Sequence, residues 1–204
     1  LLNDKVMGDL NGPQREIVEI LCKSSRDLQK LIENLLGFSR FQAEGGAPPE
    51  LAPVAAAALV KEVLADHRPS IMKKKLHCKL RLETPTVPAD PARFRILIDN
   101  LLSNAIKFTP EGGSISIVDK CDGEDWVFEV RDSGPGIPPG DRERVFQPFF
   151  QGPSPNAMHV KGTGLGLSIA REIARAHGGE LSVPEGAGGR IRLTLPLNRN
   201  PEEI

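Results

Sequence analysis

The stretch that decides the fold is Asn100-Leu-Leu-Ser-Asn104-Ala-Ile-Lys107-Phe108-Thr-Pro110. Its pattern is helical, although asparagine is a poor helix-interior residue because its amide competes for backbone hydrogen bonds. At about 100° per residue, Asn100, Asn104 and Lys107 fall on one narrow stripe. A separate apolar face has helical spacing and consists of Phe94, Leu97, Ile98, Leu101, Ala105 and Phe108. We expect this face to enter a core while the stripe faces a polar, anionic or metallic ligand.

Composition indicates a globular protein of 204 residues, 39% hydrophobic and 26% charged, with room for one ordinary domain and a smaller part. The formal net charge of -1 predicts no general attraction to nucleic acid or acidic lipid. No apolar run approaches a membrane span, and the first residues do not form a signal peptide. Cys22, Cys78 and Cys121 lack CxxC spacing, which favours free thiols in a reducing compartment. The start at Leu1, without methionine, suggests a fragment of a longer protein.

The first 41 residues are predicted to form a helical hairpin, with the tail of one helix over residues 1–8 and a turn through Pro13. The helix after the turn carries a heptad seam of Ile17, Leu21, Ser24, Leu28, Leu31, Leu35 and Phe38. The seam favours a dimer; the other interpretation is one amphipathic helix packed on its own domain. Residues 42–53, rich in Gly and Pro, are predicted to be a linker.

Residues 54–197 are predicted to form an α/β sandwich, with helices on one face of a mixed sheet, and residues 198–204 a tail. The expected order is helix, strand, helix, strand, strand, helix, helix, strand, strand. Asp90-Pro91 supplies an N-cap and a first-turn proline for the helix that carries the stripe. The basic run Lys73-Lys74-Lys75 ends a helix predicted over 54–75, where we expect it to be solvated.

Two glycine-rich loops indicate a nucleotide site. The first, Asp132-Ser-Gly134-Pro-Gly136-Ile137-Pro138, follows a strand, and its carboxylate can accept a hydrogen bond from an amino group such as that of adenine. The second, Lys161-Gly162-Thr163-Gly164-Leu165-Gly166-Leu167, runs into a helix whose free N–H groups and dipole favour phosphate. Its spacing is neither that of a P-loop nor that of a Rossmann fingerprint.

Taken together, the loops and the stripe predict a nucleoside triphosphate as ligand. Lys107 would neutralise phosphate charge, while the amide oxygens of Asn100 and Asn104 would hold Mg²⁺, which prefers oxygen ligands. The irregular segment 147–161 is typical of a lid over such a site.

Four motifs, in this order along the chain, are similar to those of bacterial two-component sensor histidine kinases. Residues 100–108 resemble the N box, 132–136 the first glycine box, 145–150 the F box and 162–167 the second glycine box. Residues 34–40, Asn-Leu-Leu-Gly-Phe-Ser-Arg, resemble the end of the second helix of the dimerisation and phosphotransfer domain.

The resemblance implies a Bergerat (GHKL) ATP-binding fold, a dimeric four-helix bundle, and transfer of the γ-phosphate of ATP to a histidine and then to an aspartate of a response regulator. It implies Mg²⁺ coordination by Asn104 together with Asn100, phosphate contact by Lys107, and recognition of the adenine amino group by Asp132. The backbone of 162–167 would bind phosphates. The catalytic portion would be cytoplasmic, with any membrane anchor in absent parts of the parent protein.

Three aromatic residues of the F box, Phe146, Phe149 and Phe150, would by the same resemblance anchor the hinge of the lid. The family's His-Glu/Asp-x-x-x-Pro box is missing, since the four histidines are His67, His77, His159 and His177. We therefore expect the phosphoacceptor upstream of Leu1, and a fragment that binds ATP without phosphorylating itself.

Three alternatives stay open. A gyrase-like or chaperone-like ATPase needs a water-activating carboxylate, yet Asn100 holds that position and Asp99 points about 100° away. A serine kinase of the anti-sigma-factor type would lack the heptad helix and the linker. In a non-catalytic module, the nucleotide would only gate the binding of a partner.

Overall fold

The computed structural model describes residues 11–18, 20–22, 25, 48–84, 86–152 and 163–198. Positions 12–18 are helical, and a capping box begins this helix: Gln14 N–H donates to Asn11 Oδ1 (3.0 Å) and Asn11 N–H donates to Gln14 Oε1 (3.1 Å). Ile17 and Leu21 of the predicted seam are exposed. The predicted helix tail at 1–8 and the other seam positions, Ser24, Leu28, Leu31, Leu35 and Phe38, lie outside the described residues.

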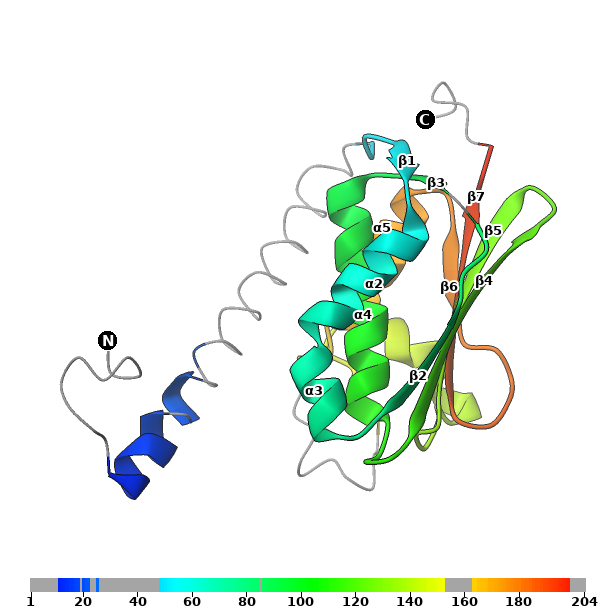
Figure 1. The fold of residues 1–204 in the computed structure, drawn as a ribbon. Helices are drawn as coiled ribbons and strands as arrows, with labels where there is room; N and C mark the ends of the chain where they lie inside the picture. The colour runs from blue at the N-terminus through cyan, green and yellow to red at the C-terminus, as the bar shows by residue number, and fades with distance from the viewer. Residues whose placement is uncertain are drawn as a thin grey trace.

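A five-stranded mixed sheet, in the order β2-β4-β5-β7-β6, forms one layer of the sandwich (Figure 1). β2 runs parallel to β4, and the other neighbouring strands are antiparallel. The strands are β2 (His77–Arg81), β4 (Ser114–Asp122), β5 (Asp125–Asp132), β6 (Glu180–Ser182) and β7 (Gly189–Pro196).

The helices form the second layer, and they cover one face of the sheet (Figure 1). They are α2 (Ala56–Asp66), α3 (Arg68–Lys73), α4 (Pro91–Phe108) and α5 (Gly166–Ala176). Two short 3-10 helices, Pro139–Asp141 and Arg144–Phe146, follow the first glycine loop. The prediction of helices on one face of a mixed sheet is confirmed.

Two details of the predicted layout are wrong. The helix predicted over 54–75 is divided at His67 into α2 and α3. Residues 52 and 53, placed in the linker, belong to β1 (Ala52–Val54), which pairs antiparallel with β3 (Val87–Ala89). These strands have three residues each and a central proline, and such short segments are too brief for sequence alternation to predict them.

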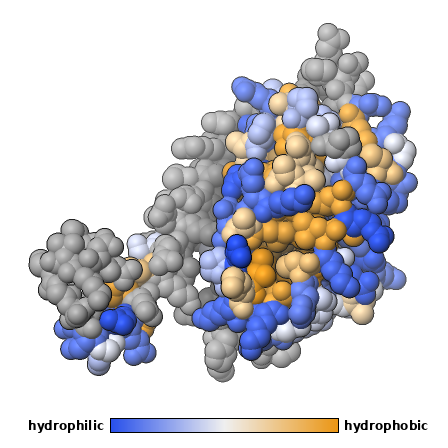
Figure 2. All heavy atoms as spheres, viewed as in Figure 1, coloured by the Kyte–Doolittle hydropathy of each residue, from blue (hydrophilic) through white to orange (hydrophobic). Residues whose placement is uncertain are grey.

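The core between the layers is built on three aromatic rings, each 0% exposed: Phe94 and Trp126 have centroids 5.7 Å apart, and Trp126 and Phe128 5.2 Å. Figure 2 shows apolar residues gathered on the face seen there, bordered by hydrophilic ones. Leu59 of α2 and Leu82, which follows β2, are partly buried and pack against the same core. The packing fixes α4 in rotation, because its apolar face cannot leave the sheet without exposing these rings.

Candidate functional site

Asn100 joins α4 to the start of α5. Its amide Nδ2 donates to the carbonyl of Ile96 at 2.9 Å, which leaves the side-chain oxygen directed away from its own turn. A Cβ on Gly166 would lie 2.7 Å from that oxygen, so a larger residue at the start of α5 would displace the Asn100 amide. The N box and the second glycine loop therefore meet, as the sequence predicted.

Lys107 and Asn104 follow on the same stripe, and both are half-buried. The Lys107 ammonium lies 5.0 Å from the centre of the Phe108 ring. Burial lowers the pKa of Lys107 below its ordinary value, because desolvation penalises the charged form. A partly desolvated cation at this position is suited to neutralise an anionic ligand.

Asp132 is the last residue of β5, and its carboxylate is enclosed by glycines. Gly134 N–H donates to Asp132 Oδ1 at 2.7 Å, and a Cβ on Gly189 would collide with the carboxylate. Burial raises the pKa of Asp132, and this outweighs the backbone hydrogen bonds from Gly134 and Gly189, which act in the opposite direction. Sequence reasoning missed Gly189; the signal that could have indicated it is the Gly188-Gly189 pair at the start of β7.

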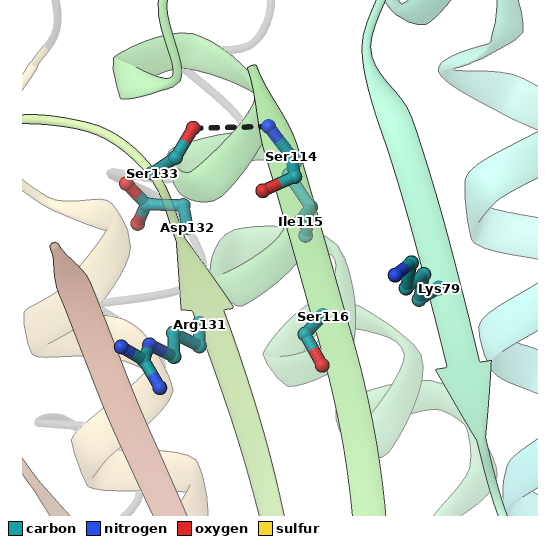
Figure 3. Close-up of a pocket in the computed structure, with 7 residues that line it drawn as sticks. All are labelled: Lys79, Ser114, Ile115, Ser116, Arg131, Asp132 and Ser133. Carbon is teal, nitrogen blue, oxygen red and sulfur yellow. Dashed lines mark hydrogen bonds between the residues drawn. The ribbon is translucent and has the colours of Figure 1, made fainter.

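The residue after Asp132 fastens the loop to the neighbouring strand. Ser133 Oγ accepts a hydrogen bond from the backbone N–H of Ser114 at 2.9 Å (Figure 3). On the helix side, a Cβ on Gly134 would lie 2.7 Å from the carbonyl of Phe108, so the loop rests on the C-terminal end of α4. Further along the loop, Ile137 packs against the core.

The second glycine loop is described from Thr163 onward, and Lys161 and Gly162 lie outside the described residues. Leu165 is buried and Leu167 packs against the core, so neither side chain is available to a ligand. Thr163 Oγ1 accepts a hydrogen bond from the backbone N–H of Leu165 at 3.2 Å. The loop therefore offers the N-terminal N–H groups of α5, which suit phosphate.

The three aromatic residues of the F box differ in their surroundings. Phe146 is buried, and the Arg171 guanidinium lies 4.7 Å from its ring centre. Phe149 is 63% exposed and adopts a positive φ of 63°, while its N–H donates to the carbonyl of Gly164 at 2.9 Å. Phe150 is half-buried under the Arg144 guanidinium. Most of the predicted lid, residues 153–161, lies outside the described residues.

The contacts of Lys74 with the end of α4 are those that sequence reasoning missed most clearly. Its ammonium donates to the carbonyls of Ile106 (2.8 Å), Lys107 (2.8 Å) and Thr109 (2.7 Å) at the end of α4. The expectation that all of Lys73-Lys74-Lys75 is solvated is wrong for Lys74, because the unpaired carbonyls of a second helix lie within its reach.

The histidines of the described residues are engaged away from the stripe or exposed. His67 Nε2 lies 2.7 Å from Asp99 Oδ1, so Asp99 is directed toward the end of α2. His177 is buried and accepts a hydrogen bond from the backbone N–H of Asp90 at 2.9 Å. His77 is exposed on β2, and His159 lies outside the described residues.

A metal at this site would need oxygen donors other than a carboxylate cluster. Among residues 48–84, 86–152 and 163–198 and the described N-terminal positions, no group of three or more His, Cys, Asp and Glu could hold a metal ion. Amide oxygens, water and ligand phosphates remain as donors, and this donor set fits Mg²⁺. In the same described part of the chain, no helix is long and apolar enough to cross a membrane.

Comparison with known proteins shows which family this chain resembles. Residues 89–199 match the model of the family described as histidine kinase-, DNA gyrase B-, and HSP90-like ATPase. The sensor histidine kinase GlrK of Escherichia coli (strain K12) is 39% identical over 202 residues, which are 98% of this chain and 42% of GlrK. The chain therefore spans about two fifths of the length of this relative.

Solved structures agree with the family match. The catalytic domain of histidine kinase ThkA superimposes with a TM-score of 0.65 at 30% identity, covering 74% of this chain and 99% of that one. Full-length ShkA in complex with AMPPNP gives a TM-score of 0.78 at 30% identity, covering 96% of this chain and 41% of that one. ThkA in complex with the response regulator TrrA gives 0.72 at 25% identity, covering 98% of this chain and 55% of that one.

Proposed function

The chain belongs to the family of histidine kinase-, DNA gyrase B- and HSP90-like ATPases, and from this premise we propose that it transfers the γ-phosphate of ATP to a histidine outside its ATP-binding domain. The domain is the ATP-binding catalytic domain of a sensor histidine kinase. The observation that carries the proposal is the meeting of the N box with both glycine loops, at Asn100 against Gly166 and at Phe108 against Gly134.

ATP would lie between the Asp132 loop and the start of α5. Asp132, enclosed by Gly134 and Gly189, would accept a hydrogen bond from the adenine amino group, and the N–H groups at the start of α5 would donate to phosphates. The residues that we propose to bind ATP are Asn100, Asn104, Lys107, Phe108, Asp132, Gly134, Gly136, Ile137, Lys161, Gly162, Thr163, Gly164, Leu165, Gly166 and Leu167.

Two groups on α4 would act on the phosphates. The Lys107 ammonium would neutralise phosphate charge, and the Asn104 amide oxygen would hold Mg²⁺, which supplies charge neutralisation when bound with ATP. Asn100 is also proposed as a ligand, although its oxygen packs against Gly166. Catalysis by these residues is positioning and electrostatic stabilisation.

The same geometry favours phosphotransfer over ATP hydrolysis. The amide of Asn100 cannot take a proton from water, and the neighbouring carboxylate, Asp99, is paired with His67 at 2.7 Å. The stripe thus presents amides and a lysine and offers no general base. The γ-phosphate therefore needs a nucleophile supplied from another part of the protein.

The test is phosphotransfer from labelled ATP to a separately purified histidine-containing helical bundle of the parent protein. Asn104→Ala should lower the Mg²⁺-dependent transfer rate by about 10²-fold, the typical cost of losing one group that stabilises developing charge. Ser103→Ala, one position away on α4, is the matched control and should transfer normally. Normal transfer by Asn104→Ala would exclude the proposed metal role.

We also propose that the helical segment 1–41 forms a homodimer and that the phosphate passes to a response-regulator receiver domain. Ile17, Ile20 and Leu21 are 57%, 58% and 61% exposed, which supports an apolar seam available to a second copy. The complex of ThkA with a response regulator supports the partner class. Analytical sedimentation of the chain with and without residues 1–41 tests the dimer. A molecular mass of one protomer for both forms would contradict it.

Since ATP is the proposed substrate, we place the catalytic portion in the cytoplasm.

A further inference from the structure

The C-terminal end of α4 is capped by a side chain from elsewhere in the chain, that of Lys74 just after α3. The last carbonyls of an α-helix have no partners within the helix. Lys74, which follows α3, donates to the carbonyls of Ile106, Lys107 and Thr109 with one ammonium, and an ammonium has three N–H groups to give. The positive charge also suits the negative end of the helix dipole. The cap therefore comes from 32 to 35 residues away along the chain.

Lys74 is itself held in place through its backbone. Its N–H donates to the carbonyl of Ser70 at 3.1 Å, and its carbonyl accepts from the N–H of Gly112 at 2.8 Å. The neighbouring His77 N–H donates to the carbonyl of Gly113 at 2.9 Å. Thus the end of α3, the end of α4 and the turn after α4 form one connected unit around this lysine.

The carbonyl of Phe108, the last residue of α4, does not accept from Lys74. It faces Gly134 of the Asp132 loop, where a Cβ would lie 2.7 Å from it. Lys107, with its partly desolvated ammonium, lies in the same turn. The last turn of α4, which Lys74 caps, therefore carries Lys107, the cation that we propose to bind phosphate. The same turn contacts the Asp132 loop.

We infer that Lys74 is a positioning residue for nucleotide binding: by fixing the last turn of α4 it sets both the Lys107 ammonium and the seat of the Asp132 loop. This inference rests on the proposed function, since it assigns a task to the same ATP site. Lys74 is not among the residues that we propose to bind ATP, and its effect passes through the backbone carbonyls of Ile106, Lys107 and Thr109.

The experiment is calorimetric titration with Mg²⁺ and AMPPNP, well below the melting temperature of every variant. Lys74→Met keeps the length of the side chain, removes the three donors, and should weaken binding about tenfold, or roughly 1.4 kcal/mol. His177→Leu is the matched control, because it removes buried hydrogen bonds at the other end of α4. It should lower the melting temperature and leave affinity unchanged.

A second variant keeps the inference testable if Lys74→Met does not fold. Lys74→Arg keeps the charge, but its planar fork cannot direct three donors to three converging carbonyls, so affinity should fall by less than in Lys74→Met. Wild-type affinity in both folded Lys74 variants would overturn the inference, and so would an equal loss in His177→Leu. If the wild-type chain itself fails to bind AMPPNP, the proposed function fails instead.

Discussion

The two ends of α4 are held in different ways. At the N-terminal end, the Asp90 carboxylate accepts from the N–H groups of Ala92 (3.0 Å) and Arg93 (3.1 Å), all within one turn of sequence. At the C-terminal end, the cap is Lys74, which directly follows a different helix, α3. The first end lies at His177, away from the stripe, whereas the second carries Lys107.

This difference separates stability from binding. The local cap at Asp90 contributes to folding and touches nothing that we assign to the nucleotide. The distant cap at Lys74 contributes to folding and also fixes the turn that faces the Asp132 loop. The comparison predicts that damage at the N-terminal end lowers stability alone, while damage at the C-terminal end lowers both.

The largest effect on stability is expected at the distant cap. Lys74→Met leaves three terminal carbonyls without their partner and should lower the free energy of unfolding by about 1.5–3 kcal/mol, the scale of hydrogen bonds to a charged group. Urea denaturation measures this change. Lys73→Met, at the exposed neighbouring position, should stay within about 0.5 kcal/mol. Equal losses in the two variants would show that the cap contributes little.

A substitution of Asp132 tests nucleotide binding separately from stability. Asp132→Asn should weaken AMPPNP binding by about 1–3 kcal/mol, because an amide replaces a charged acceptor. Its free energy of unfolding should change by less than about 1 kcal/mol. The reason is that burial of the charge, which raises the pKa of Asp132, outweighs the hydrogen bonds from Gly134 and Gly189.

The sign of the pH dependence follows from the same shift. Because the folded-state pKa of Asp132 is raised, its contribution to stability is present below the unfolded-state pKa and is lost as the pH rises through the folded-state value. In the proposed site, nucleotide binding uses the ionised form of Asp132, so affinity should fall as the pH is lowered toward the raised pKa. Titrations at several pH values should show this slope in the wild type and a flatter one in Asp132→Asn; identical slopes would contradict the assignment.

The smallest effect is expected at the local cap. Asp90→Ala should lower the free energy of unfolding by about 1 kcal/mol, as is typical for loss of an N-cap side chain, and should leave AMPPNP affinity unchanged. Thermal denaturation and calorimetry on the same sample measure the two quantities. A loss of affinity here would remove the distinction between the two ends of α4.

The site could be predicted from sequence where a residue type is demanded by its immediate neighbours. Asn100 on the polar stripe of a helix and Gly166 at the start of another helix were both identified, and the structure brings them close together. Gly189 and Lys74 were not, because their roles depend on Asp132 and on α4, which lie far away along the chain. The pairing of β1 with β3 was not predicted, for the same reason.

The sequence by itself determined where α4 begins and most of the face that enters the core, and it predicted which loops would bind phosphate. Each of these follows from local chemistry: a capping carboxylate before proline, a period of 3.6 residues, and glycines before a helix. The tertiary structure alone decided how α4 ends and what encloses Asp132. Free carbonyls and a buried carboxylate take whichever donors the fold brings near, and here those donors are Lys74 and the backbone of Gly189.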